Sequence, residues 1–189
     1  MFLQDILDEA KERMREKMTL SSTTKASQSD FEAVADNLGI SAVLINDLKL
    51  KKTQNYQFDW EVALQNSGNS GIKMQYTHCR LSNLIEANED LNATDFNFDL
   101  LQEPEAIQLI LRLAQFDEHL ARSYRLVEPS VLVRYLFGLC NDASKALKVL
   151  KVKGEPQEVA SVRLAMFKVT KNVLNFGMSI LGLRPLNKM

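Results

Sequence analysis

From Pro104 to the C-terminus, apolar side chains recur at helical spacing over long stretches, and this pattern constrains the fold more than any other feature. Three such segments begin at Pro104, Pro129 and Pro156, with apolar residues at steps of three and four. Proline is favoured in the first turn of a helix, because the N–H that it lacks would have no partner there. Gly182 follows the last segment and predicts its end. Three long helices with short connections predict an antiparallel bundle.

The earlier part of the chain also follows a helical pattern. Apolar residues predict a helix over residues 2–18, and Asp30 can cap a short helix that Gly39 ends. Residues 40–50 are almost continuously apolar, which fits a buried helix or a buried strand, and the neighbouring helices favour helix. A further helix is predicted over residues 72–87. Since no convincing alternating pattern is present, the predicted fold class is all-α.

The composition excludes several classes of protein. With 189 residues, 46% apolar and 25% charged, the chain is neither disordered nor collagen-like. It has no apolar run of the ~20 residues that cross a bilayer, so no membrane partner is expected. The two cysteines, Cys79 and Cys140, lie far apart in the sequence without a C-x-x-C motif, and only two histidines could join them, which argues against a metal site. Cys79 or Cys140 could meet His78 or His119 as a nucleophile, but cysteine is more often a buried apolar residue, and no catalytic residue is predicted.

The charge is distributed unevenly. The chain carries 13 basic and 21 acidic residues up to Pro129, but 10 basic and 3 acidic residues after it. Clustered Lys and Arg favour polyanions, because neutralising phosphates releases counterions. The C-terminal part therefore fits a polyanion partner, although two oppositely charged faces that pack together or stay solvated would give the same count.

Three stretches then carry a resemblance. They are FLQDILDEAKERM at the start, YQFDWEVALQNSGNSGIKMQYTHCRL in the middle and EVASVRLAMFKVTKNVLNFGMSILGLRPLNKM at the end. Their order and spacing resemble the C-terminal region of arginyl-tRNA synthetase. Within them, Tyr76–Leu81 resembles the family's Y-x-H-x-R-L helix, and Ala160–Leu164 resembles the A-x-R-L stretch after which its DALR-type anticodon-binding domain is named.

This resemblance implies a class I ligase that joins arginine to its tRNA with ATP and Mg²⁺. It divides the chain into the end of the catalytic region, residues 1–70, and an anticodon-binding helical bundle, residues 71–189. The family's HIGH-type motif is expected upstream, since the two histidines of this chain cannot supply it. We therefore expect a fragment or truncated product that lacks its N-terminal catalytic domain, holds no cofactor of its own, does not activate arginine alone and is a monomer.

The resemblance and the charge pattern together nominate residues for binding arginine tRNA. Tyr76 and Arg80 are four residues apart, so on a helix they present a ring and a guanidinium on one face. A core tyrosine beside a surface arginine is the alternative, and Arg163 could equally form an ion pair inside the bundle. Lysines near the end of the second long helix, with Lys153, Lys168 and Lys171, fit a phosphate-facing stripe. The predicted tRNA contacts are Lys73, Tyr76, Arg80, Lys145, Lys148, Lys151, Arg163 and Met189.

One departure from the family pattern bears on location and function. Several members have stacking aromatic residues where this chain has Lys73 and where it has Leu147 and Lys151, and in lacking them it resembles animal mitochondrial members. The expected location is the mitochondrial matrix, with the cytoplasm as the alternative. Two other functions remain open, namely a stand-alone tRNA-binding adaptor and a helical protein-interaction module without ligase activity.

Overall fold

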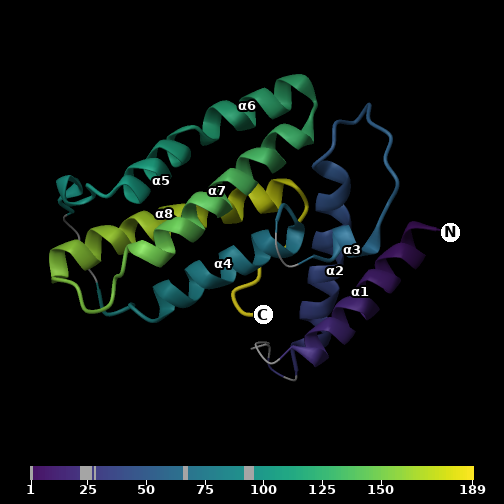
Figure 1. The fold of residues 1–189 in the computed structure, drawn as a ribbon, viewed down its shortest axis with the longest axis horizontal. Coiled ribbons are helices and arrows are strands. Elements are labelled where there is room, and N and C mark those ends of the chain that lie inside the picture. The colour runs from purple at the N-terminus through teal and green to yellow at the C-terminus, as the bar shows by residue number, and fades with distance from the viewer. Residues whose placement is uncertain (1, 22–26, 28, 66–67, 92–95) are drawn as a thin grey trace.

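The helical periodicity of the sequence is realised along most of the chain (Figure 1). The structure, a computed structural model, describes residues 2–21, 27, 29–65, 68–91 and 96–189. No strand occurs in these ranges, which confirms the all-α prediction. The elements in chain order are α1 (Leu3–Leu20), α2 (Phe31–Leu48), α3 (Trp60–Ala63), α4 (Gly71–Glu86), the 3-10 helix η1 (Phe98–Leu100), α5 (Pro104–Ala114), α6 (Phe116–Leu126), α7 (Pro129–Val149) and α8 (Gln157–Ile180).

Helices α4 to α8 form the predicted antiparallel bundle, with α5 and α6 packed along α7 (Figure 1). Pro104 and Pro129 stand in the first turns of α5 and α7, and Gly182 has a positive φ of 83° just after α8, as the sequence predicts. The sequence pattern predicts one helix from Pro104, but the segment breaks at Gln115 into α5 and α6. Phe116 is buried directly after the break, and its ring packs on that of Tyr135.

Helix α2 corrects another prediction. Residues 31–48 form one continuous helix, so Gly39 does not end it. A Cβ at Gly39 would lie 2.8 Å from the backbone nitrogen of Lys11 in α1, and this glycine therefore allows two helices to approach closely. Asp30 is the N-cap residue, but its side chain makes no capping bond to the helix. Gly39 therefore serves the packing of α2 against α1 rather than the end of a helix.

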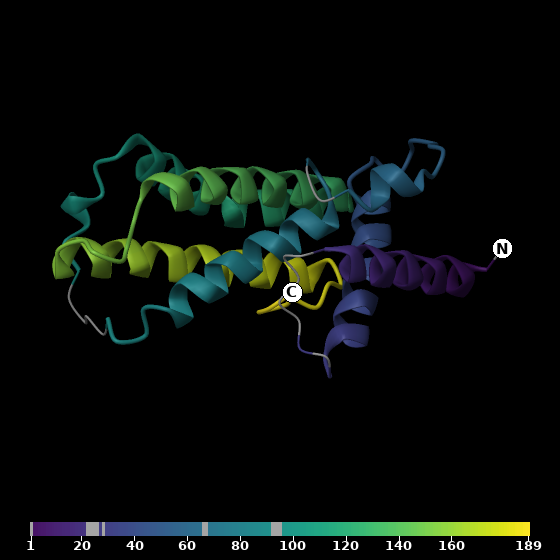
Figure 2. The same cartoon turned by 60° about the horizontal axis from the view of Figure 1, so that its bottom comes forward.

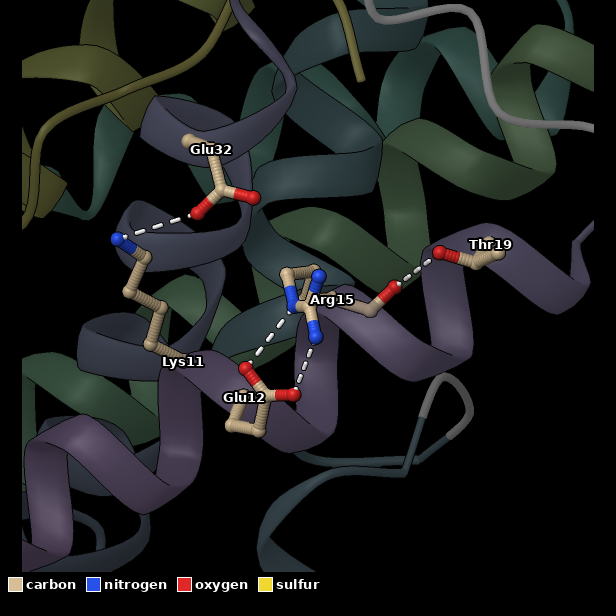
Figure 3. Close-up of polar contacts among 5 residues, drawn as sticks. All are labelled: Lys11, Glu12, Arg15, Thr19 and Glu32. Carbon is tan, nitrogen blue, oxygen red and sulfur yellow. Dashed lines mark hydrogen bonds and ion pairs between the residues drawn. The ribbon is translucent and has the colours of Figure 1, made fainter.

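Helix α1 pairs with α2 through apolar side chains. Its outward surface carries ion pairs between exposed groups, such as Arg15 with Glu12 and Lys11 with Glu32 across to α2, where nitrogen and oxygen are 3.3 Å apart (Figure 3). Exposed pairs of this kind contribute little to stability, because water and salt screen the charges. The buried Met14 and Met18 therefore contribute more to holding α1 in place.

Two apolar clusters lie side by side in the molecule. The larger one fills the bundle, and the smaller one joins α1 and α2 to the start of α4. The α1–α2 pair lies across one end of the bundle in both views (Figures 1 and 2). Ile45 of α2 belongs to the large cluster and Leu38 of α2 to the small one, so α2 connects them.

Candidate nucleic-acid interface

Helix α4 positions two of the predicted contact residues. Its start is fixed by Ser70, whose hydroxyl accepts a hydrogen bond from the backbone N–H of Lys73 at 3.1 Å. Tyr76 is 46% exposed, which rules out the alternative of a core tyrosine. The guanidinium carbon of Arg80 lies 5.8 Å from the centre of the Tyr76 ring, within the range of a cation–π contact. One turn of α4 thus presents a half-exposed ring together with a positive charge.

A pocket of about 710 Å³ lies between α1, α2, α4 and the C-terminal segment, residues 183–189. Its apolar walls come from the three helices and from the last residue of the chain, and its charged groups come from α1, α4 and the C-terminal segment. The pocket is lined by Met14, Lys17, Met18, Ser21, Leu38, Ile72, Tyr76, Cys79, Arg80, Asn83, Glu86, Lys188 and Met189. Three predicted contacts, Tyr76, Arg80 and Met189, are therefore brought together from sequence positions more than a hundred residues apart.

The C-terminal segment runs along α4 and closes one side of the pocket. Lys188 pairs with Glu86 at 2.9 Å, and the Ser82 hydroxyl donates to the Asn187 side chain at 3.1 Å. Leu186 and Met189 pack on the smaller apolar cluster. The end of the chain is thus ordered by contacts with both α4 and the α1–α2 pair.

His78 and Cys79 face this segment rather than each other. His78 Nδ1 lies 2.7 Å from the Leu186 carbonyl oxygen, and the Cys79 thiol donates to the same oxygen at 3.1 Å. Burial, aided by the positive charge of Lys171, holds the pKa of His78 below its ordinary value, although the bond to Leu186 opposes this. Burial also raises the pKa of Cys79 to about 12. A thiol that stays protonated is a poor nucleophile, so the pair does not form a catalytic dyad.

Arg163 does not lie at this interface. It is buried in the bundle, where its guanidinium pairs with Glu103 and with Glu155 and donates to the Lys151 carbonyl oxygen at 2.7 Å. Burial raises the pKa of Glu103, but a bond from its own backbone N–H and the contact with Arg163 outweigh this and leave it below the ordinary value. The prediction of Arg163 as a tRNA contact is therefore corrected in favour of the structural ion pair.

The predicted lysine contacts lie outside the pocket. Lys73 is half-buried one turn before Tyr76, whereas Lys145, Lys148 and Lys151 are exposed at the end of α7 and just beyond it. The exposed lysines at the end of α7 are therefore separate from the pocket, which has its own basic side chains in Lys17, Arg80 and Lys188. The role of the exposed lysines in binding stays a prediction.

Two protein-family models match this chain. Residues 74–189 match the family model described as the DALR anticodon binding domain, which is more than half of the chain. The chain belongs to the DALR anticodon-binding family. Residues 1–60, ahead of this DALR domain, match the model described as tRNA synthetases class I (R), catalytic domain. These matches confirm the resemblance seen in the sequence.

Similar proteins extend this result. Over its full length, the DALR chain is 38% identical to the mitochondrial arginine–tRNA ligase of Saccharomyces cerevisiae and 39% identical to the cytoplasmic one, covering 30% and 32% of those proteins. The arginyl-tRNA synthetase structure from Thermus thermophilus matches 100% of the chain and 32% of its own length, with a TM-score of 0.90 at 20% identity, and supports the fold. The chain thus spans about a third of the length of its curated relatives, which come from both compartments.

Two residues that line the pocket are not among the sequence predictions. Lys17 comes from α1, whose closeness to α4 depends on tertiary packing, and Asn83 is one of several polar residues on α4. Gln75, which lies behind the pocket wall in the sequence position before Tyr76 and is completely buried, was not predicted either. The available signal was the spacing of Gln75, His78 and Ser82, which places three polar side chains along one face of α4.

Among the described residues, no helix combines enough length and apolar character to cross a membrane. The same part of the chain has no cluster of three or more His, Cys, Asp or Glu side chains that could hold a metal ion.

Proposed function

We propose that this chain is the tRNA-binding C-terminal region of an arginine–tRNA ligase and that it binds the anticodon stem-loop of arginine tRNA. The observation that carries the proposal is the convergence of Tyr76, Arg80 and Met189 on one pocket. The DALR family match and the arginine–tRNA ligases among the relatives support the choice of tRNA.

The pocket offers chemistry that suits an unpaired nucleotide. The half-exposed Tyr76 ring is a stacking surface for a base, and Arg80 beside it can pair with a phosphate in a bidentate manner. Met189 and Met18 supply apolar walls for the edge of a base. A nucleotide turned out of the anticodon loop would therefore gain stacking, apolar contact and charge neutralisation together.

Ligase chemistry belongs to the rest of the proposed enzyme. We assign residues 1–70 to the end of the catalytic region and residues 71–189 to the anticodon-binding bundle, a division supported by separate family matches over residues 1–60 and 74–189. ATP and Mg²⁺ would act in the catalytic region of the proposed enzyme, since residues 1–60 match only part of a class I catalytic-domain family and the relatives are arginine–tRNA ligases. The chain alone is expected to bind tRNA as a monomer without activating arginine.

The proposed location is the mitochondrial matrix. It is supported by the absence of aromatic residues at Lys73, Leu147 and Lys151, the feature that the sequence shares with animal mitochondrial members. The mitochondrial relatives agree with this proposal, and the cytoplasmic relatives keep the cytoplasm as the alternative.

Replacing Tyr76 with alanine is expected to weaken binding of arginine tRNA by about 1–3 kcal/mol, because one stacking surface is removed. Helical content should stay intact, since the ring is half-exposed. Fluorescence anisotropy with labelled arginine tRNA and an unrelated tRNA, at one fixed salt concentration, measures the change. Tyr124→Ala is the matched control, because Tyr124 is 84% exposed on α6 and lies outside the pocket.

Three results would contradict different parts of the proposal. Equal affinity of the Tyr76→Ala variant and the unchanged chain would remove the pocket from the binding site. If the unchanged chain bound neither tRNA, the RNA-binding function would be wrong and a protein-interaction module would be favoured. Binding of both tRNAs with equal affinity would limit the chain to nonspecific RNA binding.

The exposed lysines are proposed to add nonspecific affinity through phosphates. Replacing Lys145, Lys148 and Lys151 together with glutamine should reduce the steepness of log affinity against log salt by about 2 to 3, because each neutralised phosphate accounts for about 0.7–0.9 of that slope. Binding titrations at four salt concentrations give this slope. The double variant Arg122→Gln with Arg125→Gln, which removes exposed charges from α6, should leave it unchanged. A triple variant with the original slope would mean that these lysines are merely solvated.

A further inference from the structure

The backbone of the C-terminal segment is hydrogen-bonded to a buried side-chain amide of α4, that of Gln75. Gln75 has no exposed surface, and its side-chain oxygen accepts a hydrogen bond from the Leu186 N–H at 2.9 Å. Its side-chain nitrogen donates to the Arg184 carbonyl oxygen and to the Ser41 hydroxyl, both at 2.9 Å. One carboxamide thus binds an N–H and a C=O of the segment while it is itself oriented by α2.

His78 of α4 forms a second hydrogen bond to the backbone of Leu186. The Leu186 carbonyl oxygen can only accept, so His78 Nδ1 carries the proton at that 2.7 Å contact. In the neutral ring Nε2 is then the acceptor, which matches the Asn175 amide nitrogen 3.2 Å away on α8. Both backbone groups of Leu186 are therefore satisfied by α4 side chains, whatever side chain Leu186 itself carries.

The anchoring of Leu186 bears on the position of Met189, three residues further along the chain. Leu186 and Met189 rest on the smaller apolar cluster, and Met189 lines the pocket beside Tyr76 and Arg80. Tyr76 lies between Gln75 and His78 in the chain, so neighbouring positions of one helix hold the segment and face the pocket. If the segment left α4, the pocket would be without its Lys188 and Met189 wall.

We propose that Gln75 and His78 are positioning residues for tRNA binding, which hold the C-terminal segment by the backbone of Leu186 so that Met189 closes the pocket. This rests on the proposed function of the pocket. Neither residue lines the pocket, so both act through the segment.

The first variant is Gln75→Met, which keeps the length of the buried side chain and removes its three hydrogen bonds. Carbon-13 labelling of methionine methyl groups, with Met189 assigned from Met189→Ala, reports by NMR whether the segment is docked. We expect the Met189 signal to move to the shift of an unstructured chain while the buried Met74 and Met178 signals stay dispersed. Affinity for arginine tRNA should fall about fivefold, the same factor as in Met189→Ala, consistent with the loss of one partly buried side chain.

The double variant separates positioning from general destabilisation. Gln75→Met combined with Met189→Ala should bind tRNA no more weakly than Gln75→Met alone, because a released Met189 no longer contributes to the pocket. Ser82→Ala is the matched control on the same face of α4. It removes a bond to the Asn187 side chain but leaves the backbone of the segment held, so docking and affinity should not change.

A second pair of variants avoids changing the interior of α4. Leu186→Pro and Leu186→Ala both remove the leucine side chain, but only Leu186→Pro also removes the N–H that donates to Gln75. The proline variant should therefore release Met189 more completely and bind tRNA more weakly than the alanine variant. This comparison decides the question if Gln75→Met does not fold.

Different results would contradict the anchoring of the C-terminal segment, its role in tRNA binding and the proposed tRNA-binding site. A docked Met189 signal in both Gln75→Met and Leu186→Pro would overturn the anchoring. A released segment with unchanged tRNA affinity, in a protein where Tyr76→Ala still weakens binding, would overturn the role of positioning and leave the proposed function intact. If Tyr76→Ala also had no effect, the proposed binding site itself would be wrong, and the role of Gln75 and His78 in tRNA binding would be wrong with it.

Discussion

Replacing Arg163 with methionine is expected to lower the free energy of unfolding by about 3 kcal/mol and to leave the tRNA affinity of the folded protein unchanged. The substitution keeps an unbranched apolar stem but leaves the carboxylates of Glu103 and Glu155 without their cation. Breaking a buried ion pair by removing one partner costs about 3–5 kcal/mol, and the partial exposure of Glu103 favours the lower end. Urea unfolding followed by circular dichroism measures the loss.

The design of this test isolates the ion pair. Lys168→Met on the same helix removes an exposed charge and should change the unfolding free energy by less than about 0.5 kcal/mol. Adding Glu103→Gln to Arg163→Met should recover part of the loss, because the stranded carboxylate is then neutral. Wild-type stability in Arg163→Met would contradict a stabilising ion pair. Weaker tRNA binding by the fully folded variant would restore Arg163 as an RNA contact.

A methyl group at Gly71 is expected to cost about 3 kcal/mol or more. An ideal Cβ at this position would lie 2.0 Å from the Ser41 carbonyl oxygen of α2, far inside van der Waals contact, and the obstacle is backbone rather than a flexible side chain. Overpacking of a core typically costs about 1–3 kcal/mol, and a backbone obstacle leaves little room for relief. The Gly71→Ala variant should therefore unfold at lower urea concentration, and tRNA binding should weaken too, because α4 carries Tyr76 and Arg80.

Gly154→Ala provides the comparison for this variant. Gly154 has a positive φ of 89°, but a Cβ there would meet nothing within 4 Å. Its replacement should cost about 1–2 kcal/mol, from backbone conformation alone. Equal losses in the two variants would mean that the contact between α4 and α2 relaxes without penalty, contrary to the close packing described.

Local sequence predicts most of the helical segments, but not all of their ends and not the contacts between them. The apolar periodicity and the prolines at 104 and 129 correctly predict where α5 and α7 begin. The prediction at Gly39 is wrong because a glycine that ends a helix and one that lets another helix approach look alike in sequence. The second case needs the position of Lys11 in α1, which no local pattern contains.

The same limit applies to the candidate site. Tyr76 and Arg80 can be paired from their spacing, since both lie on one helix. Arg163 cannot be assigned in that way, because its partner Glu103 is 60 residues away in the sequence. The anchoring of the C-terminal segment by Gln75 spans 111 residues and is equally invisible. Interactions within one helix are predictable from sequence, whereas those that complete the pocket depend on the tertiary fold.

The position of Met189 in the pocket has a practical consequence for handling this protein. Any polypeptide joined after Met189 would begin at a residue that lines the pocket together with Tyr76 and Arg80. A purification tag or a fluorescent fusion at that end is therefore expected to interfere with a nucleotide in the pocket. At the opposite end, Phe2 is 80% exposed at the tip of α1 and does not line the pocket, so a tag attached there leaves the pocket open.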